Sequence, residues 1–193
     1  MKKILVLAGP SAVGKTTVMN ELMLKNPQFD YIRSATTRAP RGDGFDSEYL
    51  YLSKEEFLSL VENGGVLEYT EYGGNFYGTP ASEIERIFAE GKTPLLILDI
   101  NGVKTLKSQK RDFSVVSVYI TADIDVLDRR LYERVIADTN TEKAYKTYEM
   151  RKEQNRKDLE EVFTLHGVFD AIIENTTPVE TANEILSFFN LQK

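Results

Sequence analysis

Residues 9–16 read GPSAVGKT and directly follow the apolar run ILVLA at residues 4–8. This stretch satisfies the pattern G-x-x-x-x-G-K-[ST], in which a glycine-rich loop joins a buried strand to a helix and its backbone N–H groups surround phosphate oxygens. An ordinary glycine-rich turn is the alternative, and the strand before the loop and the helical pattern after it argue against that alternative. The sequence therefore predicts a nucleoside triphosphate site at this loop.

Two side chains of the loop have distinct expected roles. Lys15 should reach the β- and γ-phosphates, and the Thr16 hydroxyl should bind Mg²⁺. The other residues expected at this cofactor site are Gly9, Pro10, Ser11, Ala12, Val13, Gly14 and Thr17. The motif is specific for triphosphate binding, but it leaves the reaction open.

The chain beyond the loop alternates short aliphatic runs with longer segments of helical period, as in parallel strands joined by helical crossovers. Strands are expected at residues 4–8, 31–35, 95–99, 115–120 and 171–173. Helices are expected at residues 15–24, 101–108, 124–134, 142–163 and 179–189, the last with Pro178 at its start. The pattern predicts an α/β fold with a parallel five-stranded core sheet flanked by helices.

Residues 38–92 interrupt this alternation with aromatic, turn-rich pieces, and we expect an inserted α+β subdomain that faces the substrate. Its helix should begin at SKEEF, where Ser53 and Glu56 have the spacing of a capping box. The highly charged segment at residues 134–163 is expected to form a helical lid. Residues 1–37, 93–133 and 164–193 then make up the core of a single domain.

Charge and composition exclude several classes of function. The net charge of −6, from 24 Lys and Arg against 30 Asp and Glu, argues against general binding to nucleic acid or to anionic membranes. The absence of cysteine excludes a disulfide framework, a thiolate zinc site and a cysteine nucleophile, and a single histidine excludes a multi-histidine metal site. We read KKILVLA as a buried strand and not as a signal peptide, because its apolar run is short and meets the phosphate loop. We expect a cytoplasmic monomer or homodimer.

The segment SATTRAPR at residues 34–41 places Arg38 and Arg41 in a loop-like run. Guanidinium groups bind phosphate bidentately and stay charged, so this pair predicts a second anion site, as a small-molecule kinase needs for its acceptor. A GTPase would need an N-K-x-D guanine reader after a strand, but the nearest run, NRKD at residues 155–158, departs from that pattern and lies in a helical segment. LLILD at residues 95–99 ends in Asp99, which is expected to bind Mg²⁺ or face the acceptor, unless it is an ordinary strand end.

With these motifs the chain resembles the guanylate kinases, nucleoside monophosphate kinases that convert ATP and GMP into ADP and GDP. The resemblance extends over nearly the whole chain and rests on GPSAVGKTT, SATTRAPR, EYLYL followed by SKEEF, LEYTEYGGNFYGT, LLILDINGV, DRRLYER and FDAIIEN, in this order. It implies a P-loop kinase fold in which the insertion binds GMP, the lid closes over the phosphates, and the reaction serves purine nucleotide metabolism with ATP and Mg²⁺.

The resemblance also implies roles for residues outside the loop. Ser34, Glu68 and Thr79 would face the guanine, and the GMP phosphate would be held by Arg38, Arg41, Tyr49 and Tyr77. Asp99 belongs to the same substrate set. Catalytic contacts with the transferring phosphate would come from Lys15, Arg38, Arg130, Arg134 and Arg151, and Asn175 would lie on the adenine side. Chemistry supports Glu68 independently, because one carboxylate can accept the adjacent N1–H and N2–H groups of guanine, a donor pair that adenine lacks.

Departures from the family pattern keep alternatives open. RGDG at residues 41–44 is one residue shorter than the usual R-x-G-E run, and DINGV at residues 99–103 is two residues shorter than the usual D-I-D-x-Q-G-V and lacks its second aspartate. ERVI at residues 133–136 lacks the glycines of the usual E-G-R-G. The acceptor could therefore be GMP, dGMP or another monophosphate. A catalytically silent guanylate-kinase-like binding module is the alternative from another class. Because such modules typically lose the phosphate loop, the intact Lys15 and Thr16 argue against it.

Overall fold

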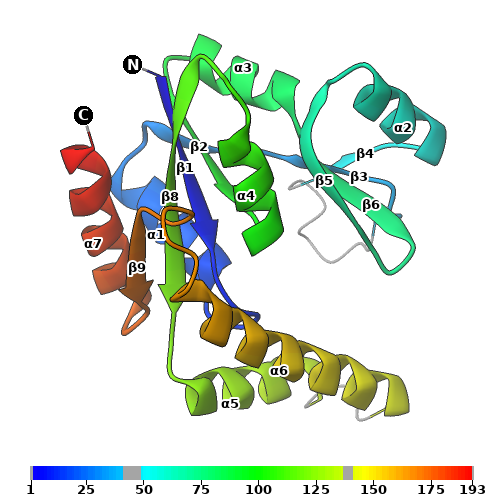
Figure 1. Ribbon diagram of the computed structural model, residues 1–193, viewed down its shortest axis with the longest axis vertical. Helices are drawn as coiled ribbons and strands as arrows, with labels where there is room; N and C mark the ends of the chain where they lie inside the picture. Colours follow the sequence, from blue (N-terminus) through cyan, green and yellow to red (C-terminus); the bar gives the residue numbers. More distant parts are fainter. Residues whose placement is uncertain (1, 41–48, 137–140, 193) are drawn as a thin grey trace.

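The computed structural model describes residues 2–40, 49–136 and 141–192 and confirms the expected α/β fold (Figure 1). All neighbouring strands of the core sheet are parallel. The order across this sheet is β2 (Phe29–Tyr31), β7 (Thr93–Ile97), β1 (Lys2–Ala8), β8 (Phe113–Thr121) and β9 (Ala171–Glu174). The phosphate loop follows the central strand, β1, so it lies at the carboxyl end of the sheet, where ligands of open α/β folds bind.

Helices cover both faces of the core sheet, which explains why β1 is apolar without interruption. Leu5 and Leu7 pack into a core on one face, whereas Ile4 and Val6 pack into a second core on the other face, and all four are fully buried. The first face is covered by α1 (Lys15–Lys25) and α7 (Pro178–Leu191), and the second by α3 (Ala81–Ala89) and α4 (Ile100–Ser108). The central strand therefore joins the phosphate loop to the two buried cores of the fold.

The insertion forms a second sheet with a helix of its own. The strand order is β4 (Tyr49–Tyr51), β3 (Ser34–Thr36), β6 (Asn75–Pro80) and β5 (Val66–Tyr72), and the helix is α2 (Lys54–Glu62). The expected capping box is confirmed: Ser53 N donates to Glu56 Oε2 at 2.7 Å, and Glu56 N donates to Ser53 Oγ at 3.1 Å. Gly73 and Gly74 both have positive φ and close the tight turn between β5 and β6.

The single strand expected at residues 31–35 is wrong. The chain leaves the core sheet after Tyr31 and enters the second sheet at Ser34, so this run supplies two short strands to two different sheets. Between them, the backbone N–H of Arg33 donates to the Glu83 carboxylate at 3.3 Å, and its guanidinium also binds Glu83. This contact with α3 redirects the chain, and Ser34 is thereby assigned to the sheet of the insertion.

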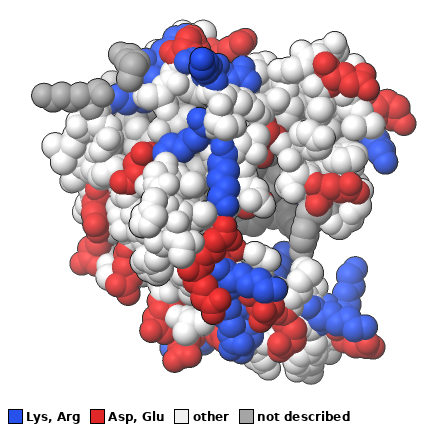
Figure 2. Space-filling view, viewed as in Figure 1, with Lys and Arg blue, Asp and Glu red and all other residues white. Residues whose placement is uncertain are grey.

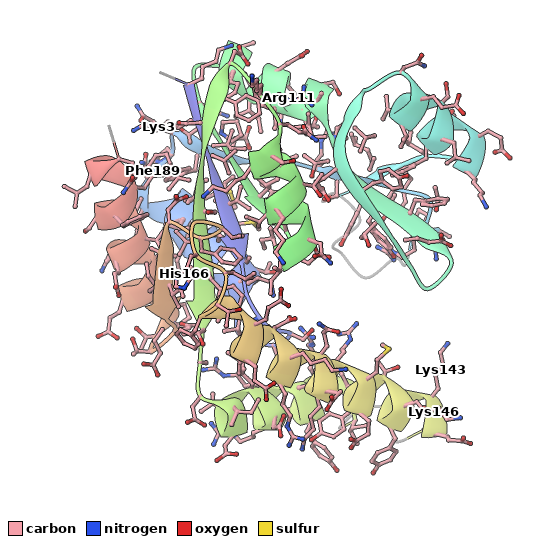
Figure 3. The ribbon with its side chains drawn as sticks, in the orientation of Figure 1. Lys3, Arg111, Lys143, Lys146, His166 and Phe189 are labelled. Atoms are coloured by element: carbon pink, nitrogen blue, oxygen red, sulfur yellow. The ribbon has the colours of Figure 1, made fainter. Side chains whose placement is uncertain are left out.

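Two helices project from the end of the core sheet at which β8 and β9 finish (Figure 1). They are α5 (Ile124–Val135) and α6 (Glu142–Val162). An ion pair between Lys152 and Asp128 at 2.7 Å joins them, and the rings of Tyr132 and Tyr148 lie 5.7 Å apart. Figure 3 shows Lys143 at the outer end of α6, away from the core. None of the described helices combines the length and apolarity needed to cross a bilayer.

Candidate active site

The phosphate loop has a backbone path that few residue types can follow. Gly9 has a φ of 147°, and a Cβ there would lie 2.2 Å from the carbonyl oxygen of Ile120. Gly14, which precedes α1, has a φ of 98°, and Ala12 has a φ of 67° although it is not a glycine. The loop therefore curls tightly between β1 and α1, with a strained residue at Ala12.

The start of α1 faces a cavity of about 550 Å³. The cavity is lined by Ser11, Ala12, Gly14, Lys15, Thr16, Thr17, Arg130, Glu133 and Arg134. Within the described residues, no side chain caps the helix and no acidic side chain lies in its first turn. The backbone N–H groups of that turn are therefore available to an anion, with the helix dipole favouring negative charge.

Lys15 folds back onto the loop, where its Nζ donates to the carbonyl oxygens of Gly9 at 2.7 Å and Pro10 at 2.9 Å. Burial of the ammonium and the positive charge of Arg134 lower the pKa of Lys15 to about 8, while the carboxylate of Asp158 acts in the opposite direction. Arg151 also lowers the pKa of Lys15. Lys15, Arg134 and Arg151 therefore lie close enough for their charges to act on one another.

The helices α5 and α6 supply the remaining cations on the donor side. Arg130 and Arg134 line the cavity directly, and burial together with the charge of Arg151 lowers the pKa of Arg134. Figure 2 shows acidic and basic side chains interspersed over the visible face of the molecule. An anion in the cavity would therefore be held by these local cations and not by a general basic surface.

Two buried asparagines form hydrogen bonds with the backbone of the phosphate loop. Asn175 Nδ2 donates to the carbonyl oxygen of Val13 at 2.6 Å, and its Oδ1 accepts from the Thr181 hydroxyl at 3.0 Å. Asn155 on α6 binds the backbone of Ser11. The structure thus places Asn175 behind the loop, and its contact with adenine stays a prediction. The role of Asn155 was not predicted from the sequence.

On the acceptor side, the guanidinium of Arg38 lies over the rings of Tyr49 at 5.1 Å and Tyr51 at 5.9 Å. Arg38 Nη2 donates to the Tyr51 hydroxyl at 3.4 Å, whereas Nη1 is buried without a hydrogen-bond partner among the described residues. The ring of Tyr77 lies 6.5 Å from that of Tyr49. Arg41, the second expected phosphate ligand, lies outside the described residues. The contact from Tyr51 was not predicted.

The carboxylate of Glu68 is held in place at the boundary between the insertion and the core. The Thr79 hydroxyl donates to Glu68 Oε1 at 2.6 Å, and both residues are buried. Burial raises the pKa of Glu68, the bond from Thr79 lowers it, and the nearby Asp99 raises it again. A Cβ on Gly102 of α4 would come within 3.2 Å of Glu68 Oε2. The pair expected at the guanine therefore lies against the start of α4.

Ser34 and Asp99 were also expected on the acceptor side. Ser34 on β3 is paired with Tyr49 on β4, so both residues belong to the second sheet. Asp99 is exposed and caps α4, with its Oδ1 accepting from Gly102 N at 2.6 Å. Asp99 therefore lies at the start of α4, close enough to Glu68 for its charge to raise the pKa of that carboxyl.

Comparison with known proteins identifies the family. A family model described as guanylate kinase matches residues 1–191. The chain belongs to the guanylate kinase family. The guanylate kinase of Parasynechococcus marenigrum is 34% identical over 178 residues, which cover 91% of each chain. That of Prochlorococcus marinus is 41% identical over 105 residues, 54% of this chain and 57% of that protein. The crystal structure of guanylate kinase from Anaplasma phagocytophilum superposes with a TM-score of 0.70 at 28% identity, covering 98% of this chain and 85% of that one.

The family match covers both the phosphate loop and the insertion. The nucleoside monophosphate kinase resemblance drawn from the sequence motifs is confirmed over essentially the whole chain. The cavity at the phosphate loop is lined by α5, and the Arg38 and Glu68 groups lie in the insertion.

Proposed function

We propose that this member of the guanylate kinase family transfers the γ-phosphoryl group of ATP to GMP and forms ADP and GDP. The observation that carries the proposal is the presence of two separate anion sites in one chain. One is the cavity at Lys15, Arg130 and Arg134, and the other is the half-buried guanidinium of Arg38, whose buried Nη1 has no hydrogen-bond partner among the described residues. A triphosphatase would need only the first of these sites.

The donor would bind with its phosphates at the start of α1. The uncapped N–H groups of the first turn and the loop backbone suit the phosphate oxygens, and Lys15 would exchange its bonds to Gly9 and Pro10 for bonds to the β- and γ-phosphates. The exposed hydroxyl of Thr16 and the second carboxylate oxygen of Asp99 are the groups that would hold Mg²⁺. Hard oxygen donors of this kind suit Mg²⁺, which neutralises phosphate charge when bound.

The acceptor would bind with its phosphate at Arg38 and its base at Glu68. The phosphate would satisfy the buried Nη1 of Arg38, with the hydroxyls of Tyr49 and Tyr77 completing the contact and Arg41 as a second expected ligand. The guanine N1–H and N2–H groups would donate to Glu68, which Thr79 holds in place. Adenine presents no such donor pair, so it would leave the Glu68 carboxylate with the bond from Thr79 but without a bond to the base.

Transfer itself requires positioning and charge neutralisation more than covalent chemistry by the protein. A phosphate oxygen of GMP attacks the γ-phosphorus in line, the bond between that phosphorus and the β,γ-bridging oxygen breaks, and ADP leaves. Negative charge spreads over the equatorial oxygens in the transition state. Lys15, Arg134 and Arg151 would stabilise this charge as the lid helices close over the phosphates and exclude water.

As a consequence of this activity we also propose a role in purine nucleotide metabolism, a cytoplasmic location, and dGMP as a second acceptor. A silent binding module would not need the cations that surround the cavity. Tight MgATP binding without transfer to any monophosphate would favour that module over the kinase.

The deciding experiment measures ADP release in a coupled assay with GMP, dGMP, AMP, CMP and UMP as acceptors. We expect turnover with GMP and dGMP and little with the others. Turnover with another monophosphate but not with GMP would contradict the acceptor assignment while leaving a kinase. Lys15→Ala should abolish transfer, whereas the matched control Lys25→Ala, at the exposed end of α1, should not.

The base selector is tested in the same assay. Glu68→Ala should reduce the preference for GMP over AMP, because the donor pair of guanine loses its acceptor. Glu71 lies on the same strand and is exposed, so Glu71→Ala is the matched control and should leave the preference unchanged. An unaltered preference in Glu68→Ala would remove Glu68 from the selector role.

A further inference from the structure

Asn155 on α6 is 1% exposed, and its side chain makes two hydrogen bonds to one residue of the phosphate loop. Ser11 N donates to Asn155 Oδ1 at 2.7 Å, and Asn155 Nδ2 donates to the carbonyl oxygen of Ser11 at 3.1 Å. A contact through both the donor and the acceptor of the amide fixes the orientation of the Ser11 backbone as well as its distance from α6.

The loop needs such an anchor because its next residue is strained. Ala12 has a φ of 67°, a conformation that costs a residue with a side chain on the order of 1–3 kcal/mol and persists only when its surroundings enforce it. On the other side of Ala12, the carbonyl oxygen of Val13 accepts from Asn175 at 2.6 Å. The strained residue therefore lies between two loop residues that are each anchored by a buried asparagine.

We infer that Asn155 is a positioning residue of the donor site: it holds Ser11, and through Ser11 the turn at Ala12, in the shape that presents the loop N–H groups to the nucleotide phosphates. Ser11 and Ala12 both line the cavity, so a change in their path alters its wall directly. The inference rests on the proposed function only in taking ATP as the ligand of the loop.

The same anchor fixes the part of α6 that carries Arg151. Arg151 lies one helical turn before Asn155, about 6 Å along the axis. Asp158 lies on the same face one turn after Asn155, and its charge acts on Lys15. Loss of the anchor should therefore loosen the attachment of this face of α6 to the loop, and with it the placement of Arg151 over the phosphates.

A merely structural role is the competing explanation, since the amide also satisfies two buried backbone groups. The two explanations differ in what they predict for ligands. A structural role lowers stability alone, whereas a positioning role weakens ATP binding selectively. Ser117 on β8 offers a matched control. Its hydroxyl is buried and makes two hydrogen bonds, to Val168 O at 2.8 Å and to Asp170 Oδ2 at 2.9 Å, and neither partner belongs to the loop.

The experiment compares Asn155→Leu, which keeps the size but removes both hydrogen bonds, with Ser117→Ala. Calorimetry gives the Kd of MgATP and of GMP for each variant, steady-state kinetics gives the KM of each substrate, and thermal unfolding gives Tm. For Asn155→Leu we expect the Kd and KM of MgATP to rise about tenfold, which is about 1.4 kcal/mol, with the GMP values within about twofold. Ser117→Ala should lower Tm without changing either Kd.

Exchange of amide hydrogens over residues 9–14 should also be faster in Asn155→Leu than in the control. A MgATP Kd that stays within about twofold of the wild-type value while Tm falls would overturn the inference and leave Asn155 a structural residue. If Asn155→Leu does not fold, Asn155→Ala and Asn155→Ser, which leave the space to water, are judged by the same limits. Should the wild-type protein fail to phosphorylate GMP, the proposed function fails, but the MgATP comparison still decides the role of Asn155.

Discussion

Raising the pH from 7 to 9 should weaken the binding of MgATP by about tenfold, because Lys15 loses its proton in this range. Burial and the charge of Arg134 lower the pKa of Lys15 from 10.5 to about 8. A lowered lysine pKa means that the ammonium is present below about pH 8 and is lost above it. In the complex, the neighbouring phosphate charges would raise the pKa again, so binding requires the protonated form.

The magnitude follows from this pKa. Close to nine-tenths of Lys15 is protonated at pH 7 and about one-tenth at pH 9, so the apparent Kd rises by about tenfold over the two pH units. The measurement is a calorimetric titration of MgATP at constant ionic strength between pH 7 and pH 9.5, with GMP as the comparison ligand. In the proposed mode GMP does not contact Lys15, so its Kd should change little as Lys15 loses its proton.

Lys15→Arg is the control, since a guanidinium keeps its charge over the whole range. We expect this variant to bind MgATP more weakly at pH 7 but with a nearly constant Kd up to pH 9.5. A wild-type Kd that does not change between pH 7 and 9 would refute the reasoning. An equal slope in Lys15→Arg would refute it as well, because the titrating group would then lie on the nucleotide or elsewhere in the site.

Three further predictions concern residues around the two sites. Gly9→Ala should abolish MgATP binding, as calorimetry would show, because its Cβ would lie 2.2 Å from Ile120 O. Gly102→Ala should raise the KM for GMP but not for ATP, because its Cβ would press on Glu68 Oε2 from 3.2 Å; equal KM changes would contradict this. Burial raises the pKa of Glu83, but hydrogen bonds from Arg33 and Arg86 outweigh it and bring the pKa to about 2. Glu83→Gln should therefore lower the unfolding free energy, measured by denaturant titration, by its largest amount above about pH 4.5. The difference from the wild-type protein should disappear as the pH falls through about 2.

The core of the fold could be predicted because its signals are local. The apolar period of β1 and the contiguous loop motif need only neighbouring residues to be read, and both lie where the sequence predicted. The strand at residues 31–35 failed for the opposite reason. Nothing within that run indicates that Arg33 will bind Glu83, 50 residues later, and thereby move the chain from one sheet to the other.

The site divides in the same way. The loop motif predicted the position of Lys15 and Thr16 at the start of α1, which the structure confirms, whereas the roles of Arg38 and Glu68 rest on their chemistry together with the family resemblance and stay predictions. Asn155 could not be predicted, because its partner Ser11 is 144 residues away and an asparagine within a charged helical segment has no distinctive pattern. The run NRKD, which contains Asn155, differs from the guanine-binding motif of GTPases and gives no further indication of a role. Only the tertiary structure shows its contact with the loop.

The two proposed anion sites use their hydrogen-bonding groups differently, and this difference affects how binding energy is distributed between them. On the donor side, Lys15, Asn155 and Asn175 all bond to loop backbone, so the loop is held in shape before any nucleotide arrives. On the acceptor side, Arg38 Nη1 is buried without a partner among the described residues. Leaving a buried donor unsatisfied costs about 1–3 kcal/mol or more for a charged group. A phosphate that accepts from Nη1 would recover this energy, so acceptor binding should stabilise the insertion more than donor binding stabilises the loop.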